Sequence, residues 1–260
     1  MSSQLIHVQN VTKIYEGKGK PVIALQDVNF SVNKGEFFTI IGPSGCGKST
    51  LLNIIAGLDK STSGKVIIEG VEVNGPSPDR IAVVFQDPAL YNWRTVLSNV
   101  EFGLEIRAVN KWERWEKALK YIRLVGLSGF EDKYPTQLSG GMKQRVAIAR
   151  ALCLETPILL MDEPFGALDE QTRLLLGIEL SKIWMETKRT VIFVTHSLFE
   201  AAFLSDRILV MTARPGKVKK IIDVDIPRPR DPNSEEINNI VRILWNELKD
   251  ESRRMMEIGI

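Results

Sequence analysis

A nine-residue glycine-rich segment constrains the fold of this chain more than any other feature of its sequence. It reads Gly-Pro-Ser-Gly-Cys-Gly-Lys-Ser-Thr at residues 42–50, here called the phosphate segment, and it directly follows an apolar run at 37–41. The pattern G-x-x-x-x-G-K-[ST] places backbone N–H groups around phosphate oxygens, between a strand and a helix. Its glycines let the backbone close on a phosphate that a Cβ would obstruct. The expected phosphate-binding residues are Gly42, Pro43, Ser44, Gly45, Cys46, Gly47, Lys48, Ser49 and Thr50.

The side chains of the phosphate segment indicate which phosphate compound it binds. Lys48 supplies a positive charge for β- and γ-phosphates, and the Ser49 hydroxyl can join the ligands of a Mg²⁺ ion. An apolar helix is expected to follow and to end near Gly57, so that its N-terminus faces the anion. A glycine-rich turn capping an ordinary helix is the alternative. Strand, motif and helix in this order favour a bound nucleoside triphosphate.

Composition limits the remaining possibilities. The chain has 260 residues, of which 44% are hydrophobic and 25% charged, as in a globular protein with one large core or one domain with an insertion. Its net charge of +2 gives no support to nucleic-acid binding. Cys46 and Cys153 show neither metal-ligand spacing nor a disulfide pattern. The start lacks the pattern of a secretion signal, and no apolar run approaches the ~18 residues that span a bilayer. A function at a membrane would therefore require a partner.

Three further apolar runs each end abruptly in polar residues. The runs cover 81–85, 158–161 and 191–194, and the residues that follow them are Gln86, Asp162 with Glu163, and Thr195 with His196. Continuous apolar runs of this length are typical of strands buried in a parallel sheet, where ligands sit outside the carboxyl ends of the strands. Each polar residue taken singly could simply mark the end of a strand. Four of them on one edge, beside the phosphate segment, predict an active site.

The chemistry of these four side chains suggests their roles. Asp162 is placed to hold Mg²⁺, and Glu163 can accept a proton from an attacking water. The Gln86 amide can orient that water or reach the metal. His196 can donate to a γ-phosphate oxygen and hold base and water in place; a structural histidine is the alternative.

A second helix start with anion-binding character lies at 138–145. Ser139 is a natural N-cap, and Gly140 and Gly141 leave the first-turn amides accessible. As an isolated feature this segment would be an ordinary helix cap.

Together these segments resemble the ATP-binding cassette (ABC) family over nearly the whole chain. The phosphate segment is similar to the Walker A motif of the family, 158–164 to its Walker B motif with the catalytic glutamate, and 138–145 to its signature. Gln86 matches the Q-loop, 167–169 the D-loop and His196 the switch histidine.

The resemblance implies a fold and a division of the chain. The fold is that of an α/β P-loop NTPase (RecA-like), with a mostly parallel sheet core, an antiparallel β-subdomain and an inserted helical subdomain. A single domain would span 1–260, with the nucleotide-binding core at 1–91 and 156–215, the helical subdomain at 92–155 and a C-terminal tail at 216–260.

The resemblance also implies ATP and Mg²⁺ as cofactors and a dimer of two cassettes. In the family, cassettes pack head to tail, so that Ser139, Gly140 and Gly141 of one would bind the γ-phosphate held by the other, with Asp169 of the D-loop beside it. Tyr15 matches the aromatic residue that stacks on adenine, although it could equally be a half-buried strand residue.

Three stretches resemble ATPase subunits of bacterial importers of nitrate, sulfonates, taurine or bicarbonate. They are 75–80, 92–104 and 211–216, whereas Tyr91-Asn92 and Ser197 depart from that group, which commonly has Leu-Pro and Asp there. The resemblance implies a peripheral ATPase at the cytoplasmic face of the plasma membrane. Its partners would be a second ATPase subunit, transmembrane permease subunits and, indirectly, a solute-binding protein, with no nucleic acid. The alternatives are an exporter or lipid-transport ATPase, a soluble cassette protein, or a P-loop kinase.

Two patterns outside the motifs also carry predictions. Trp112 and Trp115 fall at helical spacing and are expected to pack on the core of the helical subdomain. A proline-rich linker at 226–232 precedes an amphipathic helix at 237–248. The basic residues at the start of the tail are expected to form a solvated face, with anionic lipid as the alternative. They are Arg214, Lys217, Lys219, Lys220, Arg228 and Arg230.

Overall fold

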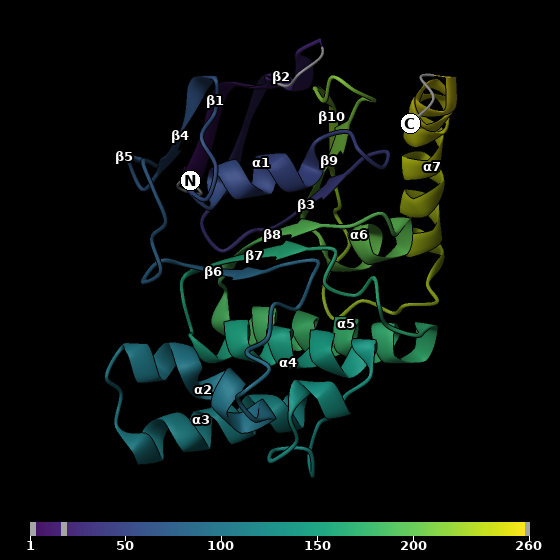
Figure 1. Ribbon diagram of the computed structural model, residues 1–260. Coiled ribbons are helices and arrows are strands. Elements are labelled where there is room, and N and C mark those ends of the chain that lie inside the picture. Colours follow the sequence, from purple (N-terminus) through teal and green to yellow (C-terminus); the bar gives the residue numbers. More distant parts are fainter. Residues whose placement is uncertain (1–3, 17–19, 258–260) are drawn as a thin grey trace.

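The apolar runs form the centre of a six-stranded sheet in the computed structural model, which describes residues 4–16 and 20–257 (Figure 1). Its strands are β3 (Phe37–Ile41), β6 (Ile81–Val84), β7 (Ile158–Asp162), β8 (Thr190–Val194), β9 (Arg207–Met211) and β10 (Val218–Asp223). Their order is β10-β9-β3-β8-β7-β6; β10 runs antiparallel to β9, and the remaining neighbours pair in parallel. Because β3, β7 and β8 are buried along their whole length, they are apolar on both faces.

A second, antiparallel sheet covers one side of this core. Its strands are β1 (Gln4–Tyr15), β2 (Val22–Asn33), β4 (Ser63–Ile68) and β5 (Val71–Glu72), in the order β2-β1-β4-β5. Helix α1 (Lys48–Ile55) lies between the two sheets (Figure 1). Leu51, Leu52 and Ile55 on α1 share one hydrophobic cluster with Phe38 and Ile40 on β3. This packing fixes the helix that follows the phosphate segment.

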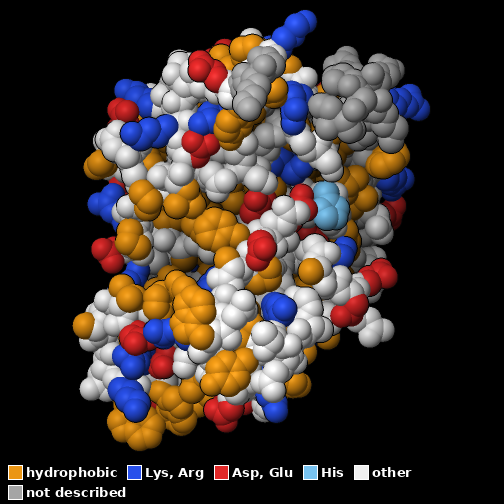
Figure 2. Space-filling model, viewed as in Figure 1, with side chains coloured by type: hydrophobic (Ala, Val, Ile, Leu, Met, Phe, Trp, Pro, Cys, Tyr) orange, Lys and Arg blue, Asp and Glu red, His pale blue; other side chains and the backbone are white. Residues whose placement is uncertain are grey.

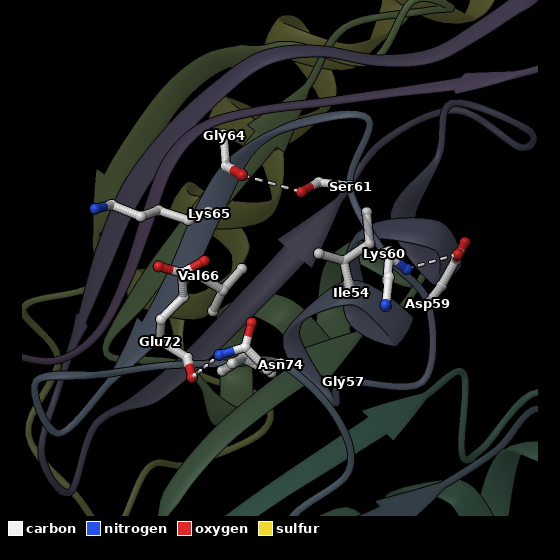
Figure 3. A pocket seen from close by; sticks show the side chains of 11 residues that line it. Ile54, Gly57, Asp59, Lys60, Ser61, Gly64, Lys65, Val66, Glu72 and Asn74 are labelled. Carbon is white, nitrogen blue, oxygen red and sulfur yellow. Dashed lines mark hydrogen bonds between the residues drawn. The ribbon is translucent and has the colours of Figure 1, made fainter.

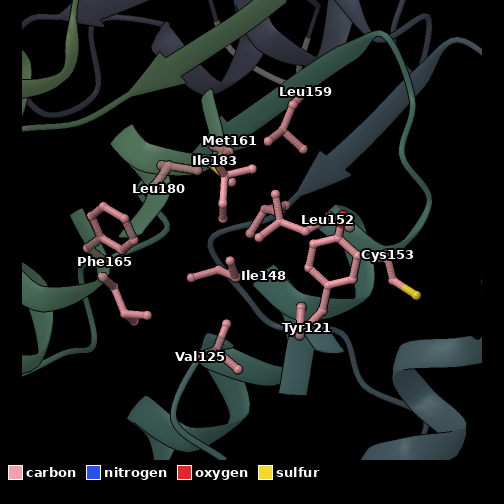
Figure 4. Close-up of a cluster of buried hydrophobic side chains, with 14 of the residues drawn as sticks. Tyr121, Val125, Ile148, Leu152, Cys153, Leu159, Met161, Phe165, Leu180 and Ile183 are labelled. Atoms are coloured by element: carbon pink, nitrogen blue, oxygen red, sulfur yellow. The ribbon is translucent and has the colours of Figure 1, made fainter. Parts of the chain in front are cut away.

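The helices of the lower part of Figure 1 form the helical subdomain. They are α2 (Val96–Ile106), α3 (Lys111–Leu124), the 3₁₀ turn η1 (Pro135–Gln137) and α4 (Gly140–Cys153), with α5 (Glu170–Thr187) between them and the sheet. One hydrophobic cluster joins Tyr121 of α3 and Leu152 of α4 to Met161 of β7 and Ile183 of α5 (Figure 4).

The mostly parallel sheet, the antiparallel sheet and the helical subdomain together confirm the predicted P-loop NTPase fold class. Of the predicted domain 1–260, residues 1–3, 17–19 and 258–260 lie outside the described residues.

The prediction for the two tryptophans of α3 is wrong. Trp112 and Trp115 are 70% and 38% exposed, and their rings contact each other with centroids 5.1 Å apart. The helix buries Ala118, Tyr121 and Ile122 instead. These residues lie in its second half, whereas the tryptophans belong to the first two turns, which project beyond the core.

The C-terminal segment completes the sheet and covers one end of it. Strand β10, at the start of the predicted tail, pairs with β9. Helix α6 (Leu198–Leu204) and the terminal helix α7 (Glu235–Glu257) pack against each other, and Leu244 of α7 is buried with Ile41 of β3 and Ile208 of β9. No helix within residues 4–16 and 20–257 combines the length and apolar character needed to cross a membrane.

One of the basic residues expected on a solvated face, Arg230, is buried, and a second, Arg228, is half-buried. Arg230 is 7% exposed and donates to the carbonyl oxygens of Ala202, Phe203 and Ser205 at 2.8–3.0 Å. Burial lowers the pKa of its guanidinium to about 10. Arg228 pairs with Asp206 and lies over the ring of Trp184. The prediction failed because carbonyl groups at the end of a helix need donors, and these arginines supply them.

Candidate functional site

The polar residues that follow the strands meet at the carboxyl edge of the six-stranded sheet. His196 Nδ1 lies 3.2 Å from Oε2 of Glu163, and Nε2 of Gln86 lies 3.5 Å from the same oxygen. Glu163 donates its backbone N–H to the carbonyl of Val194 at 2.9 Å, which ties the end of β7 to the end of β8. Glu163 has φ = 44°, a left-handed conformation that is uncommon outside glycine. Two side chains from the ends of two other strands, Gln86 and His196, thus converge on the Glu163 carboxylate.

The phosphate segment forms the turn between β3 and α1. Gly45 and Gly47 have φ of 73° and 104°, which glycine adopts without strain. A Cβ on Gly47 would also meet Leu25 Cδ2 at 2.8 Å. Lys48 is 6% exposed, and its Nζ donates to the carbonyl oxygens of Gly42 and Pro43 at 2.9 and 3.0 Å. The ammonium group is therefore held inside the turn by the backbone.

Asp162 has the features of a metal-binding carboxylate. Its Oδ1 is buried and has no hydrogen-bond partner among the described residues. Burial raises the pKa of this carboxyl, and the Ser49 hydroxyl and the Lys48 ammonium oppose that shift. A buried carboxylate oxygen without a donor, beside a hydroxyl, fits Mg²⁺, which is commonly bound by one or two carboxylates together with substrate phosphates. Within residues 4–16 and 20–257 there is no group of three or more His, Cys, Asp and Glu side chains able to hold a metal ion.

A buried carboxylate supports the segment that carries His196. The Thr195 hydroxyl donates to Oε2 of Glu200 at 2.5 Å, and the Ser197 N–H donates to Thr195 Oγ1 at 3.0 Å. Nε of Arg173, on α5, lies 3.7 Å from Oε1 of Glu200. Ser197, the residue that departs from the importer group, accepts from the Glu200 N–H as the N-cap of α6. Both neighbours of His196 are therefore fixed by hydrogen bonds.

A cavity of about 340 Å³ opens along the phosphate segment. Tyr15 lies on its wall, with 43% of its surface exposed, and its hydroxyl donates to Oδ2 of Asp59 at 3.1 Å. The cavity is lined by Tyr15, Val22, Ala24, Ser44, Gly45, Gly47, Lys48, Ser49, Thr50, Gln86, Glu163 and Arg214. Sequence reasoning missed Val22, Ala24 and Arg214. Arg214 falls in the 211–216 stretch that resembles importers, but nothing in the spacing of that stretch indicates a cavity.

The signature and D-loop residues lie outside this cavity. Ser139 caps α4 and accepts from the Met142 N–H at 3.3 Å. Asp169 caps α5 and accepts from the Thr172 N–H at 2.9 Å. A Cβ on Gly141 would approach the carbonyl of Ala167 at 3.3 Å, so the starts of the two helices lie close together. The structure brings these residues near each other, in a place separate from the phosphate segment.

Two further hollows are separate from the cavity along the phosphate segment. One lies between the end of α1 and the antiparallel sheet, and it is lined by polar residues such as Asp59, Lys60, Lys65 and Glu72 (Figure 3). The other, here called the subdomain groove, is more apolar, and its lining includes Phe85, Tyr91, Phe102, Ile106 and Arg150. Hydrophobic side chains gather along the boundary between the sheet and the helical subdomain (Figure 2).

Comparisons with known proteins agree with this geometry. A family model described as ABC transporter matches residues 25–166. An ABC transporter ATP-binding protein of Methanocaldococcus jannaschii is 57% identical over 246 residues, or 95% of this chain and 92% of the relative. The aliphatic sulfonates import ATP-binding protein SsuB of Bacillus cereus is 46% identical over 235 residues, or 90% and 92%. The nitrate import ATP-binding protein NrtD of Synechocystis is 44% identical over 222 residues, or 85% and 83%.

Solved structures of ATP-binding cassettes are also similar to this chain. A dimeric ATP-binding cassette bound to ADP and Pi has a TM-score of 0.80 and 38% identity, covering 86% of this chain and 100% of that chain. A second dimeric cassette structure has a TM-score of 0.80 and 39% identity with the same coverage. The chain therefore belongs to the ABC transporter family, in which it is an ATP-hydrolysing cassette.

Proposed function

We propose that this chain is the ATPase subunit of a binding-protein-dependent importer, at the cytoplasmic face of the membrane, whose cargo is a small anion such as a sulfonate or nitrate. The observation that carries the ATPase chemistry is the convergence of Gln86 and His196 on the Glu163 carboxylate beside the phosphate segment. The importer assignment is supported by two relatives, an aliphatic sulfonates import protein and a nitrate import protein, whose similarity covers 85–90% of this chain.

In the proposed site each residue has a chemical role. The phosphate segment binds the β- and γ-phosphates, with Lys48 turning from its carbonyl partners toward the nucleotide. Asp162 and Ser49, with Gln86 nearby, would hold Mg²⁺, which supplies positive charge to the phosphates when bound. Glu163 accepts the proton of the attacking water. His196, 3.2 Å from Glu163, orients that carboxylate and donates to the γ-phosphate.

Tyr15 is proposed to stack on the adenine ring. Tyr15 lines the cavity, and its hydroxyl donates to Asp59. A ring fixed at its polar tip and exposed on its face offers a flat surface for a base.

The complete catalytic site is proposed to need a second cassette. Ser139, Gly140 and Gly141 present the N-terminus of α4 outside the chain's own cavity, so the phosphate they bind would be held by a partner. Asp169 begins the neighbouring helix and would lie at the same interface.

The subdomain groove is proposed as the site that receives a cytoplasmic segment of the permease. The groove begins next to Gln86, since Phe85 lines it, and Gln144 donates to the Phe85 carbonyl at 3.2 Å. A segment bound there would therefore contact the residue preceding the active-site glutamine. Ile106, at the groove's edge, is 71% exposed and offers an apolar contact.

Copurification from native membranes tests this function. The tagged chain is purified from detergent-solubilised membranes of its source cell, and its partners are identified by mass. We expect a multi-span membrane subunit together with a solute-binding protein, whose ligand then reveals the cargo. Ile106→Glu should lose the membrane subunit, whereas Val71→Glu, an equally apolar and 58% exposed position on β5, should retain it. Recovery with ribosomes or DNA and without a membrane subunit would contradict the transport function.

A further inference from the structure

Arg214, which belongs to none of the family motifs, contacts the phosphate segment directly. It lies in the turn between β9 and β10, residues 212–217, and its side chain lines the nucleotide cavity. Its Nε and Nη2 both donate to the carbonyl oxygen of Gly45, at 3.2 and 2.9 Å. One guanidinium thus contributes two hydrogen bonds to one peptide group of the phosphate segment.

This contact fixes the direction of a peptide within the phosphate segment. The N–H of the same peptide, on Cys46, donates to the carbonyl of Pro43 at 3.3 Å. Because a trans peptide is planar, holding its C=O also holds its N–H on the opposite side. Gly45, with φ = 73°, has the freedom to rotate that a β-carbon would remove. Arg214 therefore restrains a peptide that the glycine itself leaves free.

The guanidinium also brings an unneutralised charge to the cavity wall. It forms no ion pair with a carboxylate within residues 4–16 and 20–257. Two of its five N–H groups reach Gly45, so the others are available to an anion in the cavity. A planar guanidinium matches phosphate geometry better than an ammonium does.

The turn that carries Arg214 is itself clamped between β2 and α7. On one side, Gly216 exchanges hydrogen bonds with Ala24 and Gln26 at 2.9 and 3.0 Å, and a Cβ on it would meet the Cys46 carbonyl at 2.1 Å. On the other side, the Ala213 N–H donates to Oε2 of Glu251 at 3.0 Å.

Glu251 is buried at the far end of α7 and is held there by the core sheet. Its Oε1 lies 3.1 Å from Nζ of Lys219 on β10. The contacts therefore run from α7 through Glu251 to the turn, and from Arg214 to the phosphate segment.

We propose that Arg214 is a positioning residue of the nucleotide site and that Glu251 on the C-terminal helix holds it in place, so that α7 contributes to nucleotide affinity. The proposal rests on the nucleotide site described above and extends it to a helix outside the family motifs.

Calorimetric titration of the full chain with ADP and Mg²⁺ tests the proposal without turnover. Arg214→Ala should weaken affinity about tenfold, as expected from the loss of charge-assisted contacts. Arg214→Lys should weaken ADP affinity less, about threefold, because its ammonium keeps the charge but lacks the two parallel donors of the guanidinium. Lys217→Ala, a neighbouring exposed cation on the same turn, is the matched control and should bind as the wild type does. In steady-state ATP hydrolysis, Arg214→Ala should raise KM and leave kcat at saturating ATP nearly unchanged.

A double-mutant cycle tests the link to α7. Glu251→Ala should weaken ADP binding about threefold in the wild-type background and have no further effect in the Arg214→Ala background, because the two act in series. Equal effects of Glu251→Ala in both backgrounds would overturn the link. Wild-type ADP affinity in folded Arg214→Ala or, if that variant does not fold, in Arg214→Lys would overturn the role of Arg214.

Lys48→Ala, titrated in parallel, separates two kinds of failure. If Lys48→Ala loses affinity and Arg214→Ala does not, only the further inference fails. If both bind ADP as the wild type does, the proposed nucleotide site itself is wrong.

Discussion

His196 Nδ1 and Glu163 Oε2 lie 3.2 Å apart, although the two residues follow different strands and are separated by 33 positions in the chain. The backbone N–H of Glu163 donates to Val194 at the end of β8, and Thr195, the neighbour of His196, donates to the buried Glu200 on α6. The pair is thus positioned by backbone and buried contacts rather than by its own hydrogen bond.

Glu163→Gln should abolish most ATP hydrolysis and leave nucleotide binding intact. An amide keeps the shape of the side chain but cannot accept the proton of the attacking water, and a general base typically contributes about 10²–10⁴-fold in rate. Phosphate release and ATP affinity are measured together, and size-exclusion chromatography with ATP should reveal a trapped dimer. The control is Glu186→Gln on the exposed side of α5. Turnover near that of the wild type would exclude Glu163 as the base.

Glu200→Gln should remove part of the pH dependence of the free energy of unfolding. Burial raises the pKa of the Glu200 carboxyl above its ordinary 4.5, against the opposing effects of the Thr195 hydroxyl and Arg173. Between pH 4.5 and the raised pKa, the folded state binds more protons at this position than the unfolded state does. The free energy of unfolding therefore falls as pH rises through that window.

Urea denaturation of the nucleotide-free chain from pH 4.5 upward measures this slope. The stability of the wild type relative to Glu200→Gln should decrease as pH rises. A difference that stays constant or increases with pH would show that Glu200 does not titrate in this way.

Gly47→Ala should weaken both stability and nucleotide binding. The backbone at Gly47 is left-handed, and a Cβ there would approach the Ala24 carbonyl at 3.0 Å. Gly129→Ala is the matched control, because Gly129 also has a positive φ of 87° but no atom within 4 Å of the added Cβ. Both variants should lose about 1–3 kcal/mol of unfolding free energy from backbone strain. Only Gly47→Ala should also lose ADP affinity; equal ADP affinities would contradict the predicted role of the turn.

Ser139→Ala should lower ATP hydrolysis while leaving ADP binding to the same chain unchanged. Its hydroxyl caps α4 outside the chain's own cavity, so its loss affects only phosphate held by a partner cassette. Thr95→Ala removes the equivalent cap of α2, where Thr95 accepts from the Ser98 N–H at 3.2 Å. Each variant should cost about 1 kcal/mol of stability. If the two variants reduce hydrolysis equally, Ser139 acts only as a cap.

The sequence predicted those parts of the molecule in which local pattern and tertiary environment agree. Runs such as 158–161 are apolar because both faces of their strands are buried, and strand ends in a parallel sheet share an edge. The environments of Arg230 and Trp112 could not be predicted from such local patterns. A cation in a proline-rich stretch is normally solvated, and only the fold reveals that carbonyls of α6 surround Arg230. Trp112 has helical spacing, but α3 extends past the surface that would bury it.

Arg214 was missed for a related reason. Its partner Gly45 is 169 residues away in the chain, and Arg214 contacts the backbone carbonyl of Gly45. The type of side chain at position 45 therefore gives no indication of the contact. The strand pairing of β9 with β3 brings the two together. A contact of this kind follows from topology and cannot be derived from a motif.

The position of β3 in the sheet has a consequence for synthesis of the protein. This strand carries the phosphate segment and is translated early, yet its two neighbours in the sheet, β8 and β9, end at Val194 and Met211. A nascent chain released from the ribosome before Met211 would have at least one edge of β3 unpaired and would lack the contact of Arg214 with Gly45. Nucleotide binding should therefore arise late during translation, when about four-fifths of the chain has emerged, and incomplete chains should not compete for ATP.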